Sequence, residues 1–410
     1  MKKAVLLFLL VVFFVTSSMS LRGENISEKI RLNGFLSQGY VYSTGNDFIP
    51  KSSKNGSFEM SEFGATFSVD LTEKLHVGFQ IFARDFGPVG NHNIKLDWGY
   101  ADYRVSEAFG IRVGKVKTPV GFFNEVRDTD ALHPMAILPQ SIYDESMRPV
   151  FVAYDGLGVY GNLNLKVLGD FDYHLFVGTV HHPEGAPHLH QIQVAANALL
   201  YQIGLSMTDI SMDTEIFCGG RVIWNTPLPG LRFGGTYTYL KGELNSMISH
   251  PLQGYFPLLG SMELRNSFFL SGEFSIGDLT IISEYMELLP FIEMEMFGQT
   301  QEVSAETMQG WYVMVSYMLG DKLTLTALYD RFISNKGDTD GVSSMMQGLP
   351  NYYGWQKDLA LGLRFDINFN WTFKIEWHKI DGMGKSWVFS PIPAPEQKWD
   401  MFVAKFSFNF

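Results

Sequence analysis

The sequence predicts an all-β protein, a transmembrane antiparallel β-barrel of about sixteen strands. Three observations support this prediction: apolar and polar residues alternate along many stretches, short and long connections separate these stretches, and alternation continues to the last residue. After residue 20 no run approaches the ~18 consecutive apolar residues of a membrane-spanning helix, although 46% of the residues are hydrophobic. The apolar residues are therefore expected to lie on strands.

The composition excludes several classes of protein. With 18% charged residues, 15% aromatic residues and 40 glycines among 410 residues, the chain is unlike disordered, collagenous or coiled-coil sequences. The net charge is −12 and no long basic run occurs, so no nucleic-acid partner is expected. Cys218 is the single cysteine, which leaves no internal disulfide and no cysteine-pair metal or redox motif. We expect burial and hydrogen bonds to stabilise the fold without a cofactor.

Residues 1–20 have the features of a secretory signal peptide. Two lysines precede the apolar run 4–15, and small residues at positions 18 and 20 supply a cleavage pattern. The run is shorter than the ~20 residues that a spanning helix requires. We therefore expect cleavage after residue 20 and a single barrel domain over residues 21–410. An N-terminal membrane anchor is the alternative.

The alternation has the period of two that places successive side chains on opposite faces of a strand. The stretches with the clearest alternation are 63–71, 75–81, 231–239, 311–319, 359–367 and 371–377. Tryptophans near the ends of such stretches are predicted to form an interfacial girdle: Trp311, Trp371, Trp377 and Trp399.

The connections fall into two classes. Short turns are predicted at 72–74, 106–108, 166–169, 226–230, 277–278, 320–321 and 368–370. Long connections are predicted at 43–57, 87–93, 118–152, 181–215, 243–262, 289–309, 334–356 and 381–397. One rim of short turns and one of long loops is typical of a membrane barrel of about sixteen strands, with fourteen and eighteen as alternatives.

Two parts of the chain resemble a known family. The terminal strand alternates to Phe410 and is similar to the C-terminal signature of Gram-negative outer-membrane porins. Residues 112–128, followed by 138–143, resemble the strand and long third loop of the phosphate-selective porin O and P superfamily. The resemblance covers residues 21–410. A sheet in lipid must close to satisfy its backbone groups, which agrees with a final strand that pairs with the first.

The resemblance implies a place, partners and a function. It implies the outer membrane of a Gram-negative bacterium, contact with outer-membrane lipid and lipopolysaccharide, recognition by the outer-membrane barrel assembly machinery, and a homotrimer. It implies a passive diffusion channel for small hydrophilic solutes and no enzyme. It also implies that residues 118–152 fold inward as a constriction loop; an outward surface loop is the alternative. A hydrophobic-substrate outer-membrane transporter and a barrel-borne hydrolase are the alternative functions.

If the apolar side of each strand faces lipid, the other side faces the lumen. This assignment is favoured because Arg or Lys facing lipid at the midplane costs ~2–4 kcal/mol. The basic residues predicted to line the pore wall are Arg84, Arg112, Arg221, Arg232, Arg265, Arg364, Lys374 and Lys405. Lys115 and Lys117 violate the alternation, so a bulge, a place near the rim or an oligomer interface remains open for them.

The predicted constriction loop 118–152 is rich in charges. Its charged residues are Glu125, Arg127, Asp128, Asp130, Asp144, Glu145 and Arg148. Charges lining a narrow pore act at close range, whereas exposed charges are screened beyond about 8 Å. We therefore expect the basic wall to outweigh the net negative charge and to favour small anions, with phosphate as one candidate.

No catalytic motif or metal motif is evident. The sequence contains no G-x-S-x-G, P-loop or H-E-x-x-H pattern, so no catalytic residue is predicted. The histidines at 181, 182, 188 and 190 lack a thiol partner and are separated by prolines. We predict that they are loop residues and not metal ligands, with metal binding as the alternative.

Overall fold

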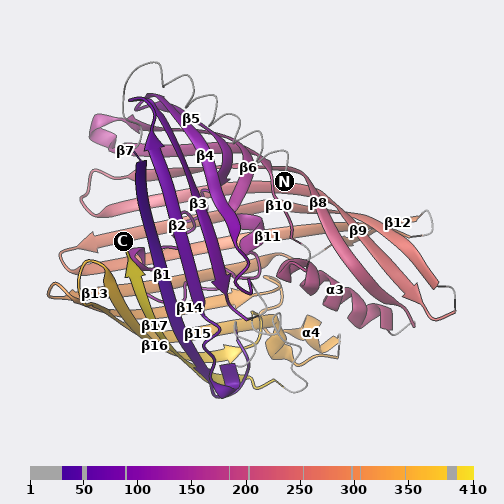
Figure 1. The fold of residues 1–410 in the computed structure, drawn as a ribbon. Coiled ribbons are helices and arrows are strands. Elements are labelled where there is room, and N and C mark those ends of the chain that lie inside the picture. The colour runs from indigo at the N-terminus through magenta and orange to yellow at the C-terminus, as the bar shows by residue number, and fades with distance from the viewer. Residues whose placement is uncertain are drawn as a thin grey trace.

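The protein forms a closed antiparallel β-barrel (Figure 1). The computed structural model describes residues 30–48, 53–87, 90–183, 185–201, 204–252, 254–296, 299–304, 306–346, 348–385 and 395–410. These residues contain 17 strands in one sheet. Sixteen of them close the barrel, because β12 pairs with β11 beyond the point where β11 leaves β13. The predicted fold class is confirmed. The predicted signal peptide lies outside the described residues.

The strands follow one another around the barrel in chain order. They are β1 (Ile30–Ser43), β2 (Ser61–Asp70), β3 (Leu75–Asp85), β4 (Lys95–Ser106), β5 (Phe109–Lys117), β6 (Ala153–Asn164), β7 (Asp170–Thr179), β8 (Ser206–Asn225), β9 (Leu231–His250), β10 (Gly254–Ile276), β11 (Leu279–Met296), β12 (Gln299–Ser304), β13 (Met308–Leu319), β14 (Leu323–Ile333), β15 (Trp355–Asp366), β16 (Trp371–Gly382) and β17 (Lys398–Asn409). The helices are α2 (Arg148–Phe151), α3 (Pro187–Leu200) and α4 (Val342–Met346), with 3-10 turns η3 (Ser53–Asn55), η4 (Asp130–Leu132), η5 (Lys166–Leu168) and η7 (Asn351–Gly354).

The first strand closes the barrel. It pairs with β2 on one side and with β17 on the other, where Phe35 lies opposite Asn409. The terminal residue takes part, since the amides and carbonyls of Gly34 and Phe410 exchange hydrogen bonds of 3.0 Å. No strand edge of the barrel is left open at this seam, as the alternation up to Phe410 predicted.

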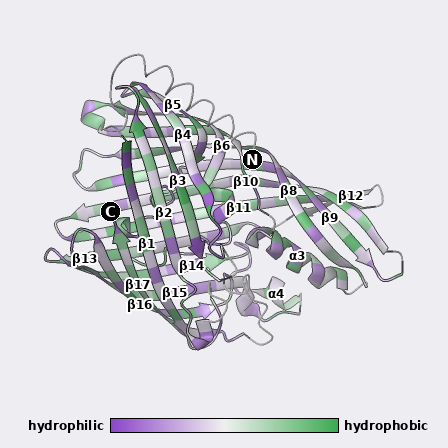
Figure 2. Ribbon diagram, viewed as in Figure 1, coloured by the Kyte–Doolittle hydropathy of each residue, from purple (hydrophilic) through white to green (hydrophobic). Residues whose placement is uncertain are grey.

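Hydrophobic and hydrophilic residues alternate along the strands of the wall (Figure 2), and the two faces of the wall differ in exposure. On one face the apolar side chains are exposed, and along each strand they alternate with buried side chains of the other face. Examples of the exposed set are Leu36, Phe63, Val113, Leu157, Leu175, Phe233, Leu270, Leu361, Ile375 and Phe402. We call these two sides the exposed face and the buried face. Trp399, predicted for the girdle, lies on the buried face at 3% exposure, with its ring 5.8 Å from that of Phe48.

The predicted short turns occur where expected, for example at 226–230 between β8 and β9 and at 277–278 between β10 and β11. Most long connections also occur, and 118–152 joins β5 to β6 with the predicted bounds. Two predicted loops are wrong. Residues 243–262 and 289–309 are largely strand, because β8, β9, β10 and β11 continue together, paired with one another, and β12 pairs with the end of β11.

The long parts of β8 to β12 therefore project from one side of the barrel (Figure 1). Helix α3 packs beside them, and Met207, Ile248 and Leu258 form a small hydrophobic cluster there. The sequence interpretation placed only a loop at 181–215, so α3 and the start of β8 at Ser206 were missed. None of the helices in the described part of the chain is long and apolar enough to cross a membrane.

Candidate functional site

The segment 118–152 connects β5 to β6 and lies against the wall. It is the most buried of the connections in the described chain. It contains η4 and α2, and most of its side chains are buried. Gly121 turns the chain with φ 56°, a conformation that favours glycine. A Cβ atom there would lie 2.4 Å from the Tyr143 hydroxyl oxygen, so this turn has no room for a side chain.

Apolar contacts hold the segment against the buried face. Val120, Phe123, Leu138 and Ile142 share one hydrophobic cluster with strand residues. The strand members of this cluster are Phe217, Leu240, Leu264, Phe269, Ile282, Met286, Tyr312, Met314, Leu328 and Ala360, among others. They come from strands β8 to β15, so the segment packs against a wide arc of the wall.

Close approach of backbones also seats the segment. At Gly310 of β13 an added Cβ would lie 2.4 Å from the Ser141 carbonyl oxygen. The Ser141 amide donates to a carboxylate oxygen of Asp330 on β14 at 3.1 Å. Glycine at 310 therefore lets the segment reach its hydrogen-bond partner on the next strand.

Glu284 of β11 is a buried anchor for the segment. One oxygen accepts the Phe122 amide at 2.9 Å and the Ser271 hydroxyl at 2.5 Å. The other oxygen accepts the hydroxyl groups of Tyr143 and Tyr312. Because two donors belong to the segment and two to the wall, this carboxylate joins them.

Asp130 anchors the segment to the last strands. Its carboxylate lies 3.0 Å from the Lys374 ammonium and 3.1 Å from that of Lys405, and it accepts the Ser407 hydroxyl at 2.7 Å. Burial opposes ionisation, but the two ammonium groups outweigh it and hold the pKa of Asp130 well below its usual range. Asp130 therefore stays ionised at neutral pH.

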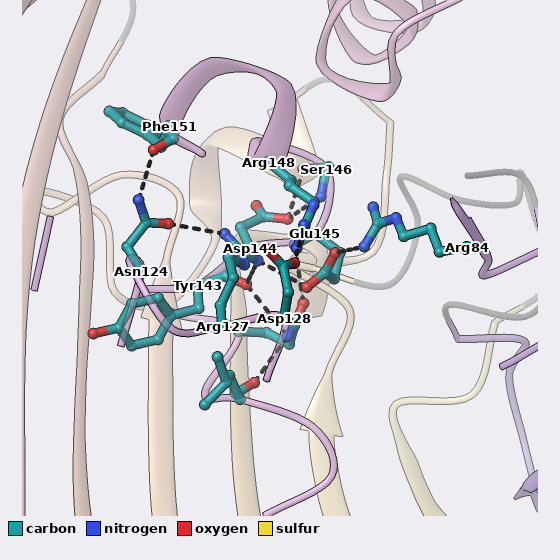
Figure 3. A network of polar contacts seen from close by, with 12 residues as sticks. Arg84, Asn124, Arg127, Asp128, Tyr143, Asp144, Glu145, Ser146, Arg148 and Phe151 are labelled. Carbon is teal, nitrogen blue, oxygen red and sulfur yellow. Dashed lines mark hydrogen bonds and ion pairs between the residues drawn. The ribbon is translucent and has the colours of Figure 1, made fainter. Parts of the chain in front are cut away.

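Figure 3 shows a second set of charges, close to α2. Glu145 pairs with Arg84 of β3 and with Arg127, the latter at 2.7 Å. Asp128 pairs with Lys117 and Arg148. Although burial opposes ionisation, these cations lower the pKa values of Asp128 and Glu145. These charged residues of the segment therefore pair either with one another or with charged residues of the wall.

The remaining segment charges also pair. Asp144 accepts the Lys385 ammonium at 2.5 Å, and Glu125 lies 2.5 Å from the Arg221 guanidinium. Lys117 is the last residue of β5, and its ammonium also lies 2.5 Å from Asp97. Its side chain is therefore buried against charged partners, although the alternation in sequence assigned it to the other face.

Each predicted basic wall residue has an acidic partner in the described chain. The pairs are Arg84–Glu145, Arg112–Asp102, Arg221–Glu125, Arg232–Glu273, Arg265–Glu263, Arg364–Asp366, Lys374–Asp130 and Lys405–Glu62. Seven of these eight basic residues either contact the segment or lie on the buried face, between the exposed apolar residues of their strands. Their charge is therefore compensated locally, which weakens any uniform positive field along the wall.

Arg265 is the exception, and its predicted orientation is wrong. The pairing of β10 shifts between Arg265 and Phe268, and Asn266 has φ 50°. This β-bulge inserts a residue and reverses the alternation beyond it. Leu264 joins the buried cluster, whereas the Arg265 side chain is 42% exposed and lies 3.7 Å over the Phe291 ring.

Two hollows lie beside the segment and share Arg112 and Glu125 as lining residues. The first, of about 190 Å³, is lined by residues of β4 to β8, including Arg104, Tyr160 and Arg221. The second, of about 310 Å³, is lined by Thr66, Gln80, Trp98, Tyr100, Arg112, Val116, Lys117, Glu125 and Thr129. Both therefore lie along the β2–β8 side of the wall, whereas the arc β9–β17 carries most anchors of the segment.

Arg112 is held rigidly between the hollows. Its Nε donates to Asp102 at 2.9 Å, and its guanidinium lies 4.2 Å from the Tyr160 ring centre and 5.4 Å from that of Tyr100. The Tyr160 hydroxyl donates to the same Asp102 carboxylate at 2.5 Å. Stacking and a charged hydrogen bond together fix the position of this cation.

Among the described residues, the histidine-rich stretch belongs to no group of three or more side chains that could hold a metal ion. Instead, Nδ1 of His182 lies 2.9 Å from Nε2 of His188, and Nε2 of His182 lies 2.8 Å from the Thr214 hydroxyl. Burial lowers the pKa of His182 to about 4 and that of His188 to about 3. Both rings are therefore neutral at pH 7 and connect the start of α3 to β8.

Sequence reasoning missed several residues of this site, among them Glu284, Tyr143, Asp102 and Tyr160. Glu284 stands between Ile282 and Met286, both buried in the hydrophobic cluster. The buried face of β11 is thus as apolar as its exposed face, and alternation cannot reveal the carboxylate there. The signal that could have identified it is an acid that shares its side of β11 with the apolar residues Ile282, Met286 and Leu288.

Comparison with known proteins gives structural neighbours only. No family model matches the chain, and no curated protein matches it in sequence. OmpF of Salmonella typhi, solved with daunomycin, superposes with a TM-score of 0.54 at 11% identity over 93% of this chain and 97% of that one. The anion-selective porin of Comamonas acidovorans gives 0.51 at 10% identity over 93% and 99%.

A third neighbour is the outer-membrane channel DcaP of Acinetobacter baumannii, with a TM-score of 0.50 at 12% identity over 92% of this chain and 97% of that one. At such low sequence identity, these superpositions show a shared fold and no more than that. Strand number, closure and superposition agree: the chain has the porin-type fold, a closed sixteen-stranded antiparallel β-barrel.

Proposed function

We propose that the protein is a passive diffusion channel of a Gram-negative outer membrane for small hydrophilic solutes. In this proposal the segment 118–152 lies inside the barrel and narrows the passage. The observation that carries the proposal is the distribution of the segment's partners. They belong to strands from all round the closed wall: Arg84 (β3), Arg221 (β8), Glu284 (β11), Asp330 (β14), Lys374 (β16) and Ser407 (β17).

The exposed apolar face supports placement in a membrane. Water would penalise such a face, whereas lipid accommodates it, and barrel closure leaves no unpaired backbone at the seam. The predicted export signal and the porin-like last strand, which pairs with β1, agree with the outer membrane. We include the homotrimer, lipopolysaccharide contacts and recognition by the barrel assembly machinery in the proposal, on the basis of the porin resemblance. No catalytic step is proposed.

The two hollows support a passage along the β2–β8 side. They share Arg112 and Glu125 as lining residues, and the segment packs against strands β8 to β15 elsewhere on the wall. A solute would therefore pass between the segment and β4–β8, with Arg112, Glu125 and Arg221 at the narrowest level.

The preference for anions remains a prediction, and the ion pairs reduce its expected size. The first hollow is lined by Arg104, Arg112 and Arg221, and also by Glu107, Glu125 and Asp172. We propose a weak preference for chloride over potassium, with phosphate as one candidate solute. Reversal potentials in a salt gradient test this, and Arg112→Ala with Arg221→Ala should shift the preference towards cations.

Planar-bilayer conductance tests the passage. Deleting residues 125–145 should raise single-channel conductance, because the narrowest section would widen. The deletion also uncovers apolar wall residues, so heat-modifiable gel migration must first show that the barrel folds. A milder variant, Glu125→Ala, removes one side chain that lines both hollows and leaves the buried anchors in place. It should raise conductance to a smaller extent. Unchanged conductance in both folded variants would show that the segment does not narrow the passage.

A further inference from the structure

The meeting point of the two hollows has a charge pattern that goes beyond a simple constriction. Within the first hollow, three guanidinium groups and three carboxylates line the same space: Arg104, Arg112, Arg221, Glu107, Glu125 and Asp172. A solute that carries one charge meets as many repulsive as attractive groups there. A solute with both charges can place each end against its opposite.

The ion pair between Glu125 and Arg221 is the most accessible of the pairs that the segment makes among the described residues. The two side chains are 30% and 14% exposed, whereas those of Asp130 and Lys374 are 2% and 1% exposed. An accessible pair gains little free energy against solvent, so a solute can displace it at low cost. Arg221 keeps its direction when displaced, because it also donates to the Gly121 carbonyl at 3.1 Å.

Arg112 supplies a second, fixed cation. Its stacking on Tyr160 at 4.2 Å and its bond to Asp102 prevent it from swinging into the passage or away from it. The same hollow is lined by the rings of Tyr160, Tyr173 and His174. These rings offer an apolar and aromatic surface next to the charges, which suits a small side chain on the solute.

From this geometry we propose that the Glu125–Arg221 pair and Arg112 form a binding subsite for small zwitterions that carry one carboxylate and one ammonium group, as amino acids do. The solute's carboxylate takes the place of Glu125 against Arg221, within reach of the field of Arg112. Its ammonium takes the place of Arg221 against Glu125. The exchange replaces one opposite-charge contact by two, so neither Glu125 nor Arg221 is left without an opposite charge. This inference rests on the proposed function of a diffusion channel.

Proteoliposome uptake at pH 7 tests the inference with three probes that share one ring: phenylalanine as the zwitterion, 3-phenylpropanoate as the anion and 2-phenylethylammonium as the cation. Uptake into protein-free liposomes is subtracted. Wild type should admit phenylalanine about fivefold faster than either ion, which corresponds to ~1 kcal/mol. In Glu125→Gln, phenylalanine and the anion should enter at nearly equal rates, and both should enter faster than the cation. Arg221→Gln should reduce the preference for phenylalanine and favour the cation.

The matched control is Glu215→Gln. Glu215 lies on β8 like Arg221 and pairs with Lys241 at 2.8 Å, with both side chains well exposed, but neither lines a hollow. This variant should behave as wild type, whereas an equal loss of preference in it would overturn the inference.

The outcomes separate the two proposals. Open channels in planar bilayers without any preference for phenylalanine would overturn the subsite and leave the diffusion channel standing. A preference that survives both Glu125→Gln and Arg221→Gln would overturn the assignment to these residues. Folded protein that forms no channels at all would overturn the proposed function, and the subsite with it.

Discussion

Removal of the Glu284 carboxylate should release the segment 118–152 from the wall. The change is Glu284→Ala, which deletes the acceptor of four hydrogen bonds. Two of the donors, the Phe122 amide and the Tyr143 hydroxyl, belong to the segment. A buried donor left without a partner costs about 1–3 kcal/mol. The Phe122 amide keeps a second acceptor, the Tyr143 hydroxyl oxygen at 3.0 Å, so the Tyr143 hydroxyl is the segment donor that loses its partner, and the segment should lose about 1–3 kcal/mol of anchoring free energy.

The isosteric variant Glu284→Gln separates the charge from the shape. Its carbonyl oxygen can still accept from Phe122 and Ser271, while its NH2 group can donate to the hydroxyl oxygens of Tyr143 and Tyr312. We expect a loss of only about 1 kcal/mol, the usual net value of a neutral hydrogen bond. The alanine variant should thus lose up to about 2 kcal/mol more than the glutamine variant, which corresponds to up to about thirtyfold in the population of the released segment.

Limited proteolysis of the folded, detergent-purified protein measures this population. Cleavage within 118–152 should be faster in Glu284→Ala than in wild type and nearly unchanged in Glu284→Gln. Single-channel recordings should show added current noise in the alanine variant as the segment moves. Equal protection of the segment in wild type and Glu284→Ala, with the barrel intact by heat-modifiable migration, would refute the anchor.

Three further predictions concern other contacts. Gly310→Val should displace the segment and raise its proteolysis, because an added Cβ would lie 2.4 Å from a segment carbonyl oxygen; Gly235→Val, where nothing lies within 4 Å, is the control and should have no effect. Burial lowers the pKa values of His182 and His188 to about 4 and about 3, so the folded form disfavours their protonation. The contribution of these histidines to stability should therefore be fully present above the ordinary pKa of ~6.5. It should fall as pH falls towards 4, by about 3 kcal/mol for His182. Amide hydrogen exchange in α3 at pH 7.5 and pH 5 checks the sign of this change. Lys385→Met should loosen the end of the segment near Asp144, since the 2.5 Å ion pair is buried, and should speed cleavage there.

The barrel could be predicted because each strand has two different environments. Exposed apolar residues and buried partners alternate with period two, and the turns interrupt that alternation at every short connection. Where the exposed face of a strand becomes polar, the alternation of apolar and polar residues no longer identifies the strand. On β9, Lys241 and Glu243 follow Tyr239 on the exposed face, so alternation of hydrophobicity ends although the strand continues to His250.

The site was predictable in part for related reasons. The bounds of the segment and the positions of most basic residues follow from loop length and alternation. Arg265 could not be placed, because the bulge at Asn266 leaves no mark in hydrophobicity. The role of Glu284 as an acceptor on the wall depends on the path of a segment that local patterns do not determine.

The anchors of the segment have a consequence for the order of assembly. Phe122 finds its partner 162 residues later in the chain, Ala136 bonds a carboxylate 240 residues later, and Asp130 is reached by Ser407 from 277 residues away. The segment is thus synthesised well before most of its partners. Until β11, β16 and β17 arrive, its apolar and charged residues have nothing to pack against, and contacts of such long separation form slowly. Seating of the segment and closure of β17 on β1 are therefore expected to occur together, as the last event of folding.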